Sequence, residues 1–157
     1  MAGDPWRDPA ALTALLQLVD AARRAGAPDQ ASEAAVEHAF AASRRLAVYG
    51  TLVPGGSNHH QVASLGGDWQ PGTVRGRRVM RTFPAFTWDE RDAPVAVMLL
   101  VADGLPAAWA RLDAFEGRDY VRVLVPVRLD TGALAVANLY EPVVPVAPTG
   151  HPTGHSA

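Results

Sequence analysis

The sequence contains neither cysteine nor lysine, and all fourteen basic residues among its 157 are arginine. The missing cysteine excludes disulfide bonds, thiolate nucleophiles and cysteine-based metal sites. No hydrophobic stretch approaches the roughly 18 residues that a membrane-spanning helix needs. The first residues, Met1 to Asp8, lack the basic-then-apolar order of a secretory signal. We therefore expect a cytoplasmic protein that has no membrane partner.

An excess of charge of one sign is also absent. The formal net charge is -2, and hydrophobic and charged residues make up 48% and 19% of the chain, as in an ordinary globular domain. Such a chain has no electrostatic reason to bind nucleic acid. A single domain of 157 residues is long enough to bury a substantial core.

The first 45 residues carry helix signals. Asp8 can cap a helix over residues 9–25, Pro9 suits its first position, and Gly26 follows its end. A second helix is expected over residues 30–44. The first helix bears one apolar stripe, formed by Leu12, Leu15, Leu16 and Val19. This stripe must pack on the second helix, on the rest of the chain or on another subunit, so one expected arrangement is a homodimer through these helices.

From residue 46 the pattern changes to strands, which we predict at 46–52, 73–80, 95–101, 120–128 and 134–140. Asp130-Thr131-Gly132 has the chemistry of a tight turn, so the last two strands should form a hairpin. A single helix is expected over residues 106–115. This order indicates an α+β fold with a mostly antiparallel sheet that can close into a small β-barrel at residues 46–142. Residues 143–157 are expected to form a flexible tail.

Two segments carry the functional signal. In the first, the short strand 46–49 stops at Gly50 and opens into a loop rich in proline and glycine. Glycine permits close approach of a ligand, and successive backbone N–H groups in such a turn can bind an anion or a developing oxyanion. A simple turn without a ligand is the competing interpretation.

The second segment runs from Leu112 to Arg122 and places an acid, a glycine and a tyrosine after a helix. Glu116 lies at the end of an apolar helix face beside Phe115, where partial desolvation raises the pKa of a carboxyl group. A carboxyl of that kind can serve first as a general base and then as a general acid. The competing interpretation is a solvated carboxylate at a helix C-terminus.

Together and in this order, the two segments resemble the gamma-glutamylcyclotransferase-like superfamily, most closely its gamma-glutamylamine cyclotransferase-type branch. The residues that carry the resemblance are Tyr49-Gly50-Thr51-Leu52 and Leu112-Asp113-x-Phe115-Glu116-Gly117, the latter followed by a tyrosine and an arginine. The resemblance spans about residues 46–140. It implies a small barrel with one or two helices, preceded here by the N-terminal two-helix extension of residues 1–45.

The resemblance also implies an activity: cyclisation of a gamma-glutamyl amine or peptide to 5-oxoproline, with release of the free amine. It implies Glu116 as the general acid/base and no cofactor. Substrate-binding positions carried over from the family are Tyr49, Gly50, Thr51, Leu52, Asn58 and Tyr120. The chain departs from the family where Ala96-Val97 replace a frequent Gly-Glu pair. This departure bears on substrate fit more than on the fold.

Other interpretations remain open at this point. The same cavity can belong to a non-catalytic module that binds a small anionic ligand, or the barrel can be a scaffold for interactions through the N-terminal helices. His151 and His155 have an i, i+4 spacing, but they lie in a segment rich in glycine and proline rather than in a helix. We therefore expect no metal site and no cofactor.

Overall fold

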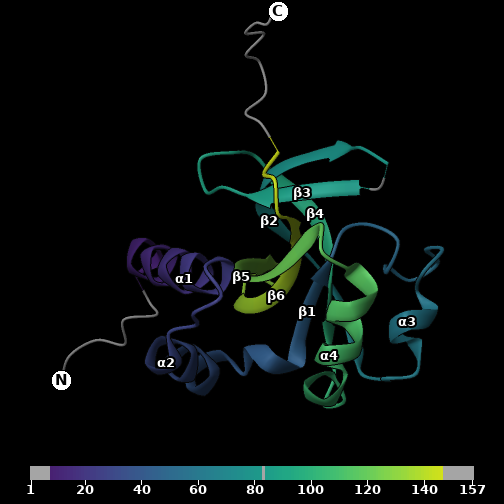
Figure 1. Cartoon of the computed structure of the whole chain (residues 1–157), viewed down its shortest axis with the longest axis horizontal. Coiled ribbons are helices and arrows are strands. Elements are labelled where there is room, and N and C mark those ends of the chain that lie inside the picture. The colour runs from purple at the N-terminus through teal and green to yellow at the C-terminus, as the bar shows by residue number, and fades with distance from the viewer. Residues whose placement is uncertain (1–7, 83, 147–157) are drawn as a thin grey trace, which may run out of the picture.

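The computed structural model describes residues 8–82 and 84–146 (Figure 1). The elements in chain order are α1 (Pro9–Arg24), α2 (Gln30–Phe40), the 3-10 turn η2 (Ala42–Arg44), β1 (Arg45–Val48), α3 (His60–Ala63), β2 (Asp68–Met80), β3 (Pro84–Trp88), β4 (Pro94–Val101), α4 (Leu105–Glu116), β5 (Tyr120–Leu129) and β6 (Leu134–Pro142). Among these helices, none combines the length and hydrophobicity that a bilayer crossing requires.

Five strands close into a barrel. They follow the order β2-β4-β1-β6-β5, and β5 pairs back onto β2 to complete the ring. Only the β1–β6 pair is parallel, through the register Leu46↔Asn138, whereas the other pairs are antiparallel. β3 stands outside the ring as a hairpin partner of β2. The predicted α+β, mostly antiparallel barrel is therefore confirmed.

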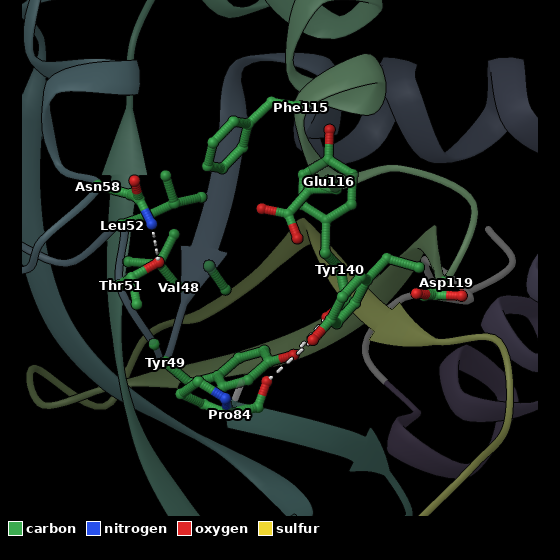
Figure 2. Close-up of a pocket in the computed structure, with 13 residues that line it drawn as sticks. Val48, Tyr49, Thr51, Leu52, Asn58, Pro84, Phe115, Glu116, Asp119 and Tyr140 are labelled. Carbon is green, nitrogen blue, oxygen red and sulfur yellow. Dashed lines mark hydrogen bonds between the residues drawn. The ribbon is translucent and has the colours of Figure 1, made fainter. Parts of the chain in front are cut away.

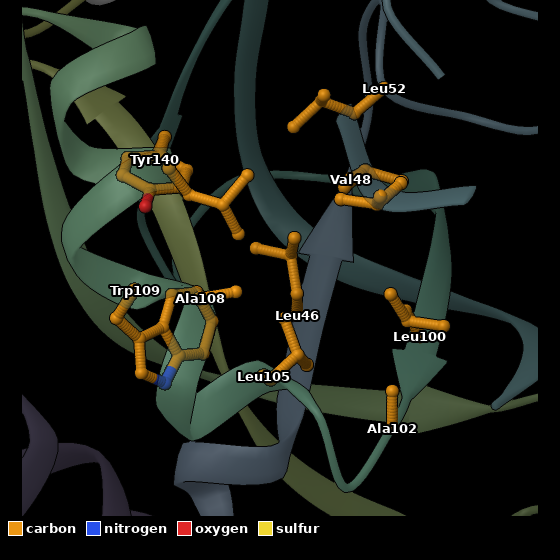
Figure 3. Close-up of a cluster of buried hydrophobic side chains, with 11 residues drawn as sticks. Leu46, Val48, Leu52, Leu100, Ala102, Leu105, Ala108, Trp109 and Tyr140 are labelled. Carbon is orange, nitrogen blue, oxygen red and sulfur yellow. The ribbon is translucent and has the colours of Figure 1, made fainter. Parts of the chain in front are cut away.

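Side chains on the two faces of β5 pack into two separate hydrophobic cores. Val123, Val125 and Val127 point into the barrel and are at most 1% exposed. Leu124 points the other way and packs under α1. A third core lies between α4 and the outer face of the barrel, where Trp109 and Leu112 of the helix meet β1 (Figure 3). This third core positions the end of α4 beside the end of β1.

The N-terminal helices pack on the barrel itself. Asp8 caps α1 by accepting a hydrogen bond from the N–H of Ala10, as the sequence predicts. The apolar stripe of α1 is buried against Val36 of α2 and against two barrel residues, Leu124 and Val136. The stripe therefore needs no second subunit to cover it.

Two polar side chains of α1 also bond to residues of the barrel strands. The buried carboxyl group of Asp20 accepts a hydrogen bond from the N–H of Leu124 at 2.7 Å. Arg24 pairs with Glu141 of β6, whose side chain is only 6% exposed. Each of these barrel groups would lack that partner without α1, so the extension is an integral part of the structure.

Several element boundaries differ from the sequence prediction. β1 ends at Val48 rather than at residue 52, because the chain leaves the sheet at Tyr49. α2 ends at Phe40, because Ala41 adopts a left-handed conformation with φ of 51° before the 3-10 turn. β2 begins at Asp68, five residues earlier than predicted, and the sequence analysis missed β3 and the single turn α3 altogether.

The segment after β6 begins in contact with the barrel. Val146 is 3% exposed, and its N–H donates a hydrogen bond to the hydroxyl of Thr87. Val146 of the predicted flexible tail therefore packs on β3, whereas residues 143–145 are exposed. The rest of that predicted tail, residues 147–157, lies outside the described residues.

Candidate active site

A cavity of about 280 Å³ opens where β1 ends, between the loop after β1 and the C-terminal end of α4 (Figure 2). All seven residues that the sequence analysis places at the site line it: Tyr49, Gly50, Thr51, Leu52, Asn58, Glu116 and Tyr120. The two sequence motifs are more than 60 positions apart in the chain. The fold brings them together because α4 packs along β1 through the third core.

Glu116 is the last residue of α4, and its carboxyl group points into the cavity (Figure 2). Within the described part of the chain, this carboxyl has no hydrogen-bond or ion-pair partner. Burial raises its pKa to about 7, and the negative charge of Asp113 adds to the shift. The cavity therefore holds a carboxyl group that can take up and release a proton near neutral pH.

Asp113 lies one helical turn before Glu116 but is engaged elsewhere. Arg122 donates to it through Nε at 2.9 Å and Nη2 at 3.2 Å, and the Tyr140 hydroxyl donates at 2.6 Å. Burial by itself raises the pKa of Asp113, but these hydrogen bonds and the nearby arginine charges outweigh it and hold the pKa below its usual range. Asp113 is thus an ionised neighbour that acts on Glu116 through its charge.

The loop after β1 is fixed by its own hydrogen bonds. The backbone N–H of Asn58 donates to the carbonyl of Thr51 at 2.9 Å, and its side-chain amide donates to the Thr51 hydroxyl at 3.0 Å. Gly56 lies in this turn, where an added Cβ would stand 2.4 Å from the Thr51 carbonyl oxygen. Asn58 therefore orients the loop in addition to lining the cavity.

The same loop presents backbone donors. The N–H groups of Gly50, Thr51 and Leu52 donate to no acceptor among residues 8–82 and 84–146. Thr51 and Leu52 face Glu116 across the cavity (Figure 2). Unpaired N–H groups on one wall and a titratable carboxyl on the other wall form a site suited to acyl chemistry.

Three tyrosines, Tyr49, Tyr120 and Tyr140, line the cavity. The Tyr49 hydroxyl donates to the backbone carbonyl of Tyr140 at 2.6 Å, and the Tyr120 hydroxyl donates to the carbonyl of Pro84 at 3.3 Å (Figure 2). Burial raises the pKa of all three phenols. They therefore remain neutral at physiological pH and contribute shape and hydrogen bonds rather than charge.

Four lining residues with large or charged side chains were not predicted as site residues: Pro84, Phe115, Asp119 and Tyr140. A signal for Tyr140 existed in the sequence. The predicted turn is centred on Thr131, so a tight hairpin places residue 140 opposite Arg122, as the observed register has it. Because opposite residues share a face of the sheet, Tyr140 had to lie on the side of Tyr120.

No metal site is evident in the part of the chain that the structure describes. There, no three His, Asp or Glu side chains come together as a possible ligand set. His59 makes a contact of its own, because its Nδ1 lies 3.0 Å from the carbonyl oxygen of Leu52.

Comparison with known protein families shows to which family this chain belongs. Residues 46–152, more than half of the chain, match the family model described as gamma-glutamyl cyclotransferase, AIG2-like. The chain belongs to this family. The AIG2-like match begins at β1, so α1 and α2 lie outside it. No curated protein matches the chain.

Solved structures show the same AIG2-like fold. YkqA from Bacillus subtilis matches with a TM-score of 0.53 and 26% identity, over 62% of this chain and 35% of YkqA. This chain thus spans about a third of the length of YkqA. An AIG2-like protein from Mus musculus matches with a TM-score of 0.53 and 21% identity, over 67% of this chain and 80% of that protein. At5g39720.1 from Arabidopsis thaliana matches with the same TM-score and identity, over 67% and 72%.

Proposed function

We propose that this protein cyclises the gamma-glutamyl group of an amine or peptide, which forms 5-oxoproline and releases the free amine. The observation that carries this proposal is the Glu116 carboxyl. It is unpartnered among the described residues, faces the cavity, and has a pKa of about 7. A module that only bound an anionic ligand would gain nothing from a glutamate in its cavity, because the charge of the glutamate would repel that of the ligand.

In the proposed reaction the substrate supplies its own nucleophile. Ionised Glu116 removes a proton from the α-ammonium group of the substrate, and the resulting amine attacks the carbon of the γ-carbonyl. A carbon–nitrogen bond forms and closes the five-membered ring, while the carbonyl oxygen becomes an oxyanion. Holding the glutamyl chain folded makes this step intramolecular, which is the main entropic requirement of the reaction.

The loop after β1 receives the negative charge in this mechanism. The N–H groups of Gly50, Thr51 and Leu52 donate to the α-carboxylate or to the oxyanion. Each donor of this kind contributes about 3 kcal/mol when it is aimed at a developing oxyanion. Backbone donors suit this role here because the described residues that line the cavity include no arginine or histidine.

The second half of the reaction breaks the bond to the leaving amine. The carbonyl re-forms, the carbon–nitrogen bond to the amine breaks, and protonated Glu116 gives its proton to the departing nitrogen. The ring nitrogen loses its remaining extra proton to solvent. A single carboxyl with a pKa near neutrality can take both roles in turn.

The test is the substitution Glu116→Gln, assayed by release of 5-oxoproline from a panel of gamma-glutamyl amines and peptides. The amide keeps the size of the side chain but cannot exchange the proton, so kcat should fall by about 10²-fold or more. Glu37→Gln is the matched control, because Glu37 is an exposed residue of α2, and in the variant the amide oxygen can still accept from the N–H of Ser43 while the amide NH2 donates to its hydroxyl. Equal kcat values for Glu116→Gln and the parent would refute the assignment.

A non-catalytic binding module can be distinguished from an enzyme by measurements on the parent protein. If the parent bound gamma-glutamyl amines without releasing 5-oxoproline, the cavity would be a receptor rather than an active site. Calorimetric titration of the parent with these amines, together with the turnover assay, separates the two functions.

A further inference from the structure

An arginine of the N-terminal helices reaches the region directly behind the cavity. Arg23 lies in the last turn of α1, outside the residues that match the family model, and its side chain is 16% exposed. Its guanidinium donates to the backbone carbonyl of Arg122 at 3.2 Å and to the side chain of Asn138. Tyr120 and Tyr140 line both the cavity and the cleft in which Arg23 lies, so Arg23 is on the other side of this cavity wall.

Four charged side chains and one amide form a continuous hydrogen-bond network here. Arg23 donates to both carboxylate oxygens of Glu33, at 2.7 and 2.8 Å, and to the amide oxygen of Asn138 at 2.9 Å. Arg122 donates to the same amide oxygen at 3.1 Å and to both carboxylate oxygens of Asp113. We call these five residues the polar network: Glu33, Arg23, Asn138, Arg122 and Asp113.

Asn138 is the fixed centre of the polar network. It is 1% exposed, and its side-chain nitrogen donates to the carbonyl of Ala42 at 2.8 Å, which orients its amide oxygen toward the two arginines. Two cations that share one acceptor repel each other, but each of them is paired with one carboxylate on its outer side. The four charges of the network sum to zero, so the loss of any one of them affects the others.

Arg122 and Glu33 line the same two clefts, which have volumes of about 610 and 390 Å³. As long as Arg23 forms its two-pronged ion pair with Glu33, this carboxylate is satisfied and Arg122 stays on Asp113. Without Arg23, Glu33 is an unpaired anion that is only 25% exposed, and it attracts the Arg122 guanidinium into the open cleft.

Asp113 carries the effect of the polar network to Glu116. Its carboxylate accepts from Arg122 of β5 and from the Tyr140 hydroxyl of β6, and the charge of Arg23 in α1 also acts on it. Asp113 lies one helical turn before Glu116. Any part of its negative charge that Arg122 does not neutralise therefore disfavours ionisation of Glu116.

The other titratable groups around the cavity are one acid and three phenols: Asp119, Tyr49, Tyr120 and Tyr140. Asp119 is exposed, and burial keeps the phenols neutral near pH 7. Arg81 acts on Tyr120, but its guanidinium donates to two backbone carbonyls. Among the described residues, only Tyr140 of these groups bonds to the polar network through its side chain, and its hydroxyl is uncharged.

We propose that Arg23 is a positioning residue for Glu116: by holding Glu33 and Asn138 it keeps the Arg122 guanidinium on Asp113, so the N-terminal helices set the charge beside the catalytic carboxyl. This inference rests on the proposed function for the role of Glu116. It gives the helices outside the family match a part in the reaction. The competing interpretation is that Arg23 only docks α1 on the barrel.

The first measurement is the pH profile of kcat/KM for release of 5-oxoproline from a gamma-glutamyl amine. In Arg23→Gln, Arg122 turns toward Glu33 and leaves Asp113 less neutralised, so the rising limb should move to higher pH by about half a pH unit. Glu33→Gln alone should move the limb to lower pH, because Arg23 then adds uncompensated positive charge. A loss of packing would lower the rate or the stability without moving the limb.

The double variant Arg23→Gln/Glu33→Gln separates positioning from docking. It restores the charge balance, and an amide in place of the Glu33 carboxylate offers Arg122 no second anion, so the limb should return to its position in the parent. Arg24→Met is the matched control, because it removes another arginine of α1 that pairs with Glu141 rather than with the polar network. Its pH profile should coincide with that of the parent.

The outcomes separate this inference from the proposed reaction. An Arg23→Gln limb at the parent position, or a double variant displaced as far as Arg23→Gln, would overturn the inference and leave the reaction intact. Should Arg23→Gln fail to fold, the direction of the Glu33→Gln shift decides instead, and a shift to higher pH or no shift would overturn the inference.

If no gamma-glutamyl substrate released 5-oxoproline, the proposed function would fail, and NMR titration of the Glu116 carboxyl in the same variants would test the inference by itself. The pKa of Glu116 should still rise in Arg23→Gln and return to the parent value in the double variant. Equal pKa values in the parent and in Arg23→Gln would remove the inference as well.

Discussion

Glu116 shows how one residue acquires its chemistry from its position. The end of a helix is an unfavourable place for a negative charge, because the last carbonyl groups already carry partial negative charge. Burial and the charge of Asp113 disfavour ionisation further. The carboxyl is therefore protonated much more readily than an ordinary glutamate, and this is the property that a base and acid in one reaction requires.

The pH dependence of kcat/KM should report this pKa. Base catalysis needs ionised Glu116, and the ionised fraction rises with pH through about 7. The rate should therefore rise about tenfold per pH unit below that value and level off above it. Asp113→Asn removes a like charge and frees the Arg122 cation, so both effects lower the pKa of Glu116 and should move the rising limb to lower pH.

The control for this shift is Asp103→Asn, which removes an exposed carboxylate before α4 that is 96% accessible. Its pH profile should coincide with that of the parent. A profile of Asp113→Asn that moved to higher pH, or did not move, would contradict the electrostatic account of the site.

Local motifs and the family resemblance that they carry predicted most of the cavity wall but not its side-chain geometry. The Gly50 and Glu116 motifs predicted both walls, because their backbone and acid–base roles depend on residues close in sequence. Tyr140 reaches the cavity through the β5–β6 register, which the predicted turn around Thr131 already implies. Pro84 reaches it through the pairing of β3 with β2, and this pairing leaves no local pattern of side chains from which it could be predicted.

At the scale of elements, the loop after β1 depends on one close approach. Gly56→Ala would place a methyl group against the Thr51 carbonyl, a backbone atom that cannot yield without moving the loop. We expect the N–H donors of the loop to be displaced and kcat/KM to fall by about tenfold or more, with little change in the thermal unfolding midpoint.

Gly104→Ala provides the comparison for the loop. Its added Cβ would meet the side chain of Leu65 at 3.3 Å, which is a flexible neighbour away from the cavity. Normal kcat/KM in Gly56→Ala, measured beside this control, would show that the loop geometry does not matter for turnover.

The helix α1 should contribute to stability through charge as well as through its apolar stripe. Arg24→Met keeps much of the apolar stem but leaves the buried carboxyl of Glu141 without its cation. Because Arg24 itself is 29% exposed, we expect a loss of about 2 kcal/mol rather than the full ~3–5 kcal/mol of a fully buried pair.

Urea unfolding measures this loss. Adding Glu141→Gln to Arg24→Met should restore part of the stability, since the amide needs no counterion and can still accept the N–H of Trp88. If the double variant were no more stable to urea than Arg24→Met, then Arg24 would stabilise the protein through packing rather than through its charge.

The sequence predicted the elements with strong local signals and missed those that depend on partners. The valine alternation of β5 and the capped helix α1 carry their own periodicity, and both were found. β3 has only five residues and begins with proline, so its strand conformation comes from pairing with β2 rather than from its own sequence. The single turn α3 is too short to have a helical period.

At the scale of the whole molecule, the proposed chemistry needs only the polypeptide and its substrate. We expect 5-oxoproline release to survive treatment with EDTA and to need no added cofactor, because proton transfer and backbone donors supply every step. Activity lost on chelation and restored by one defined metal would show that the proposed mechanism is incomplete. Known amounts of 5-oxoproline measured with and without EDTA provide a check that EDTA does not act on the detection of product.

The parallel seam between β1 and β6 has a consequence for the order of folding. Leu46 and Asn138 are more than 90 residues apart in the chain, and Asn138 also bonds to Ala42 and to Arg23 of α1. Joining such distant segments costs loop entropy before any contact repays it. The β5–β6 hairpin is local and can form first, whereas ring closure must wait for it. The stripe of α1 can pack early on Leu124 and Val136 of this hairpin. The interior of the barrel, which also needs β1 and β4, stays open until the ring closes, so the slow step of folding is also the step most exposed to aggregation.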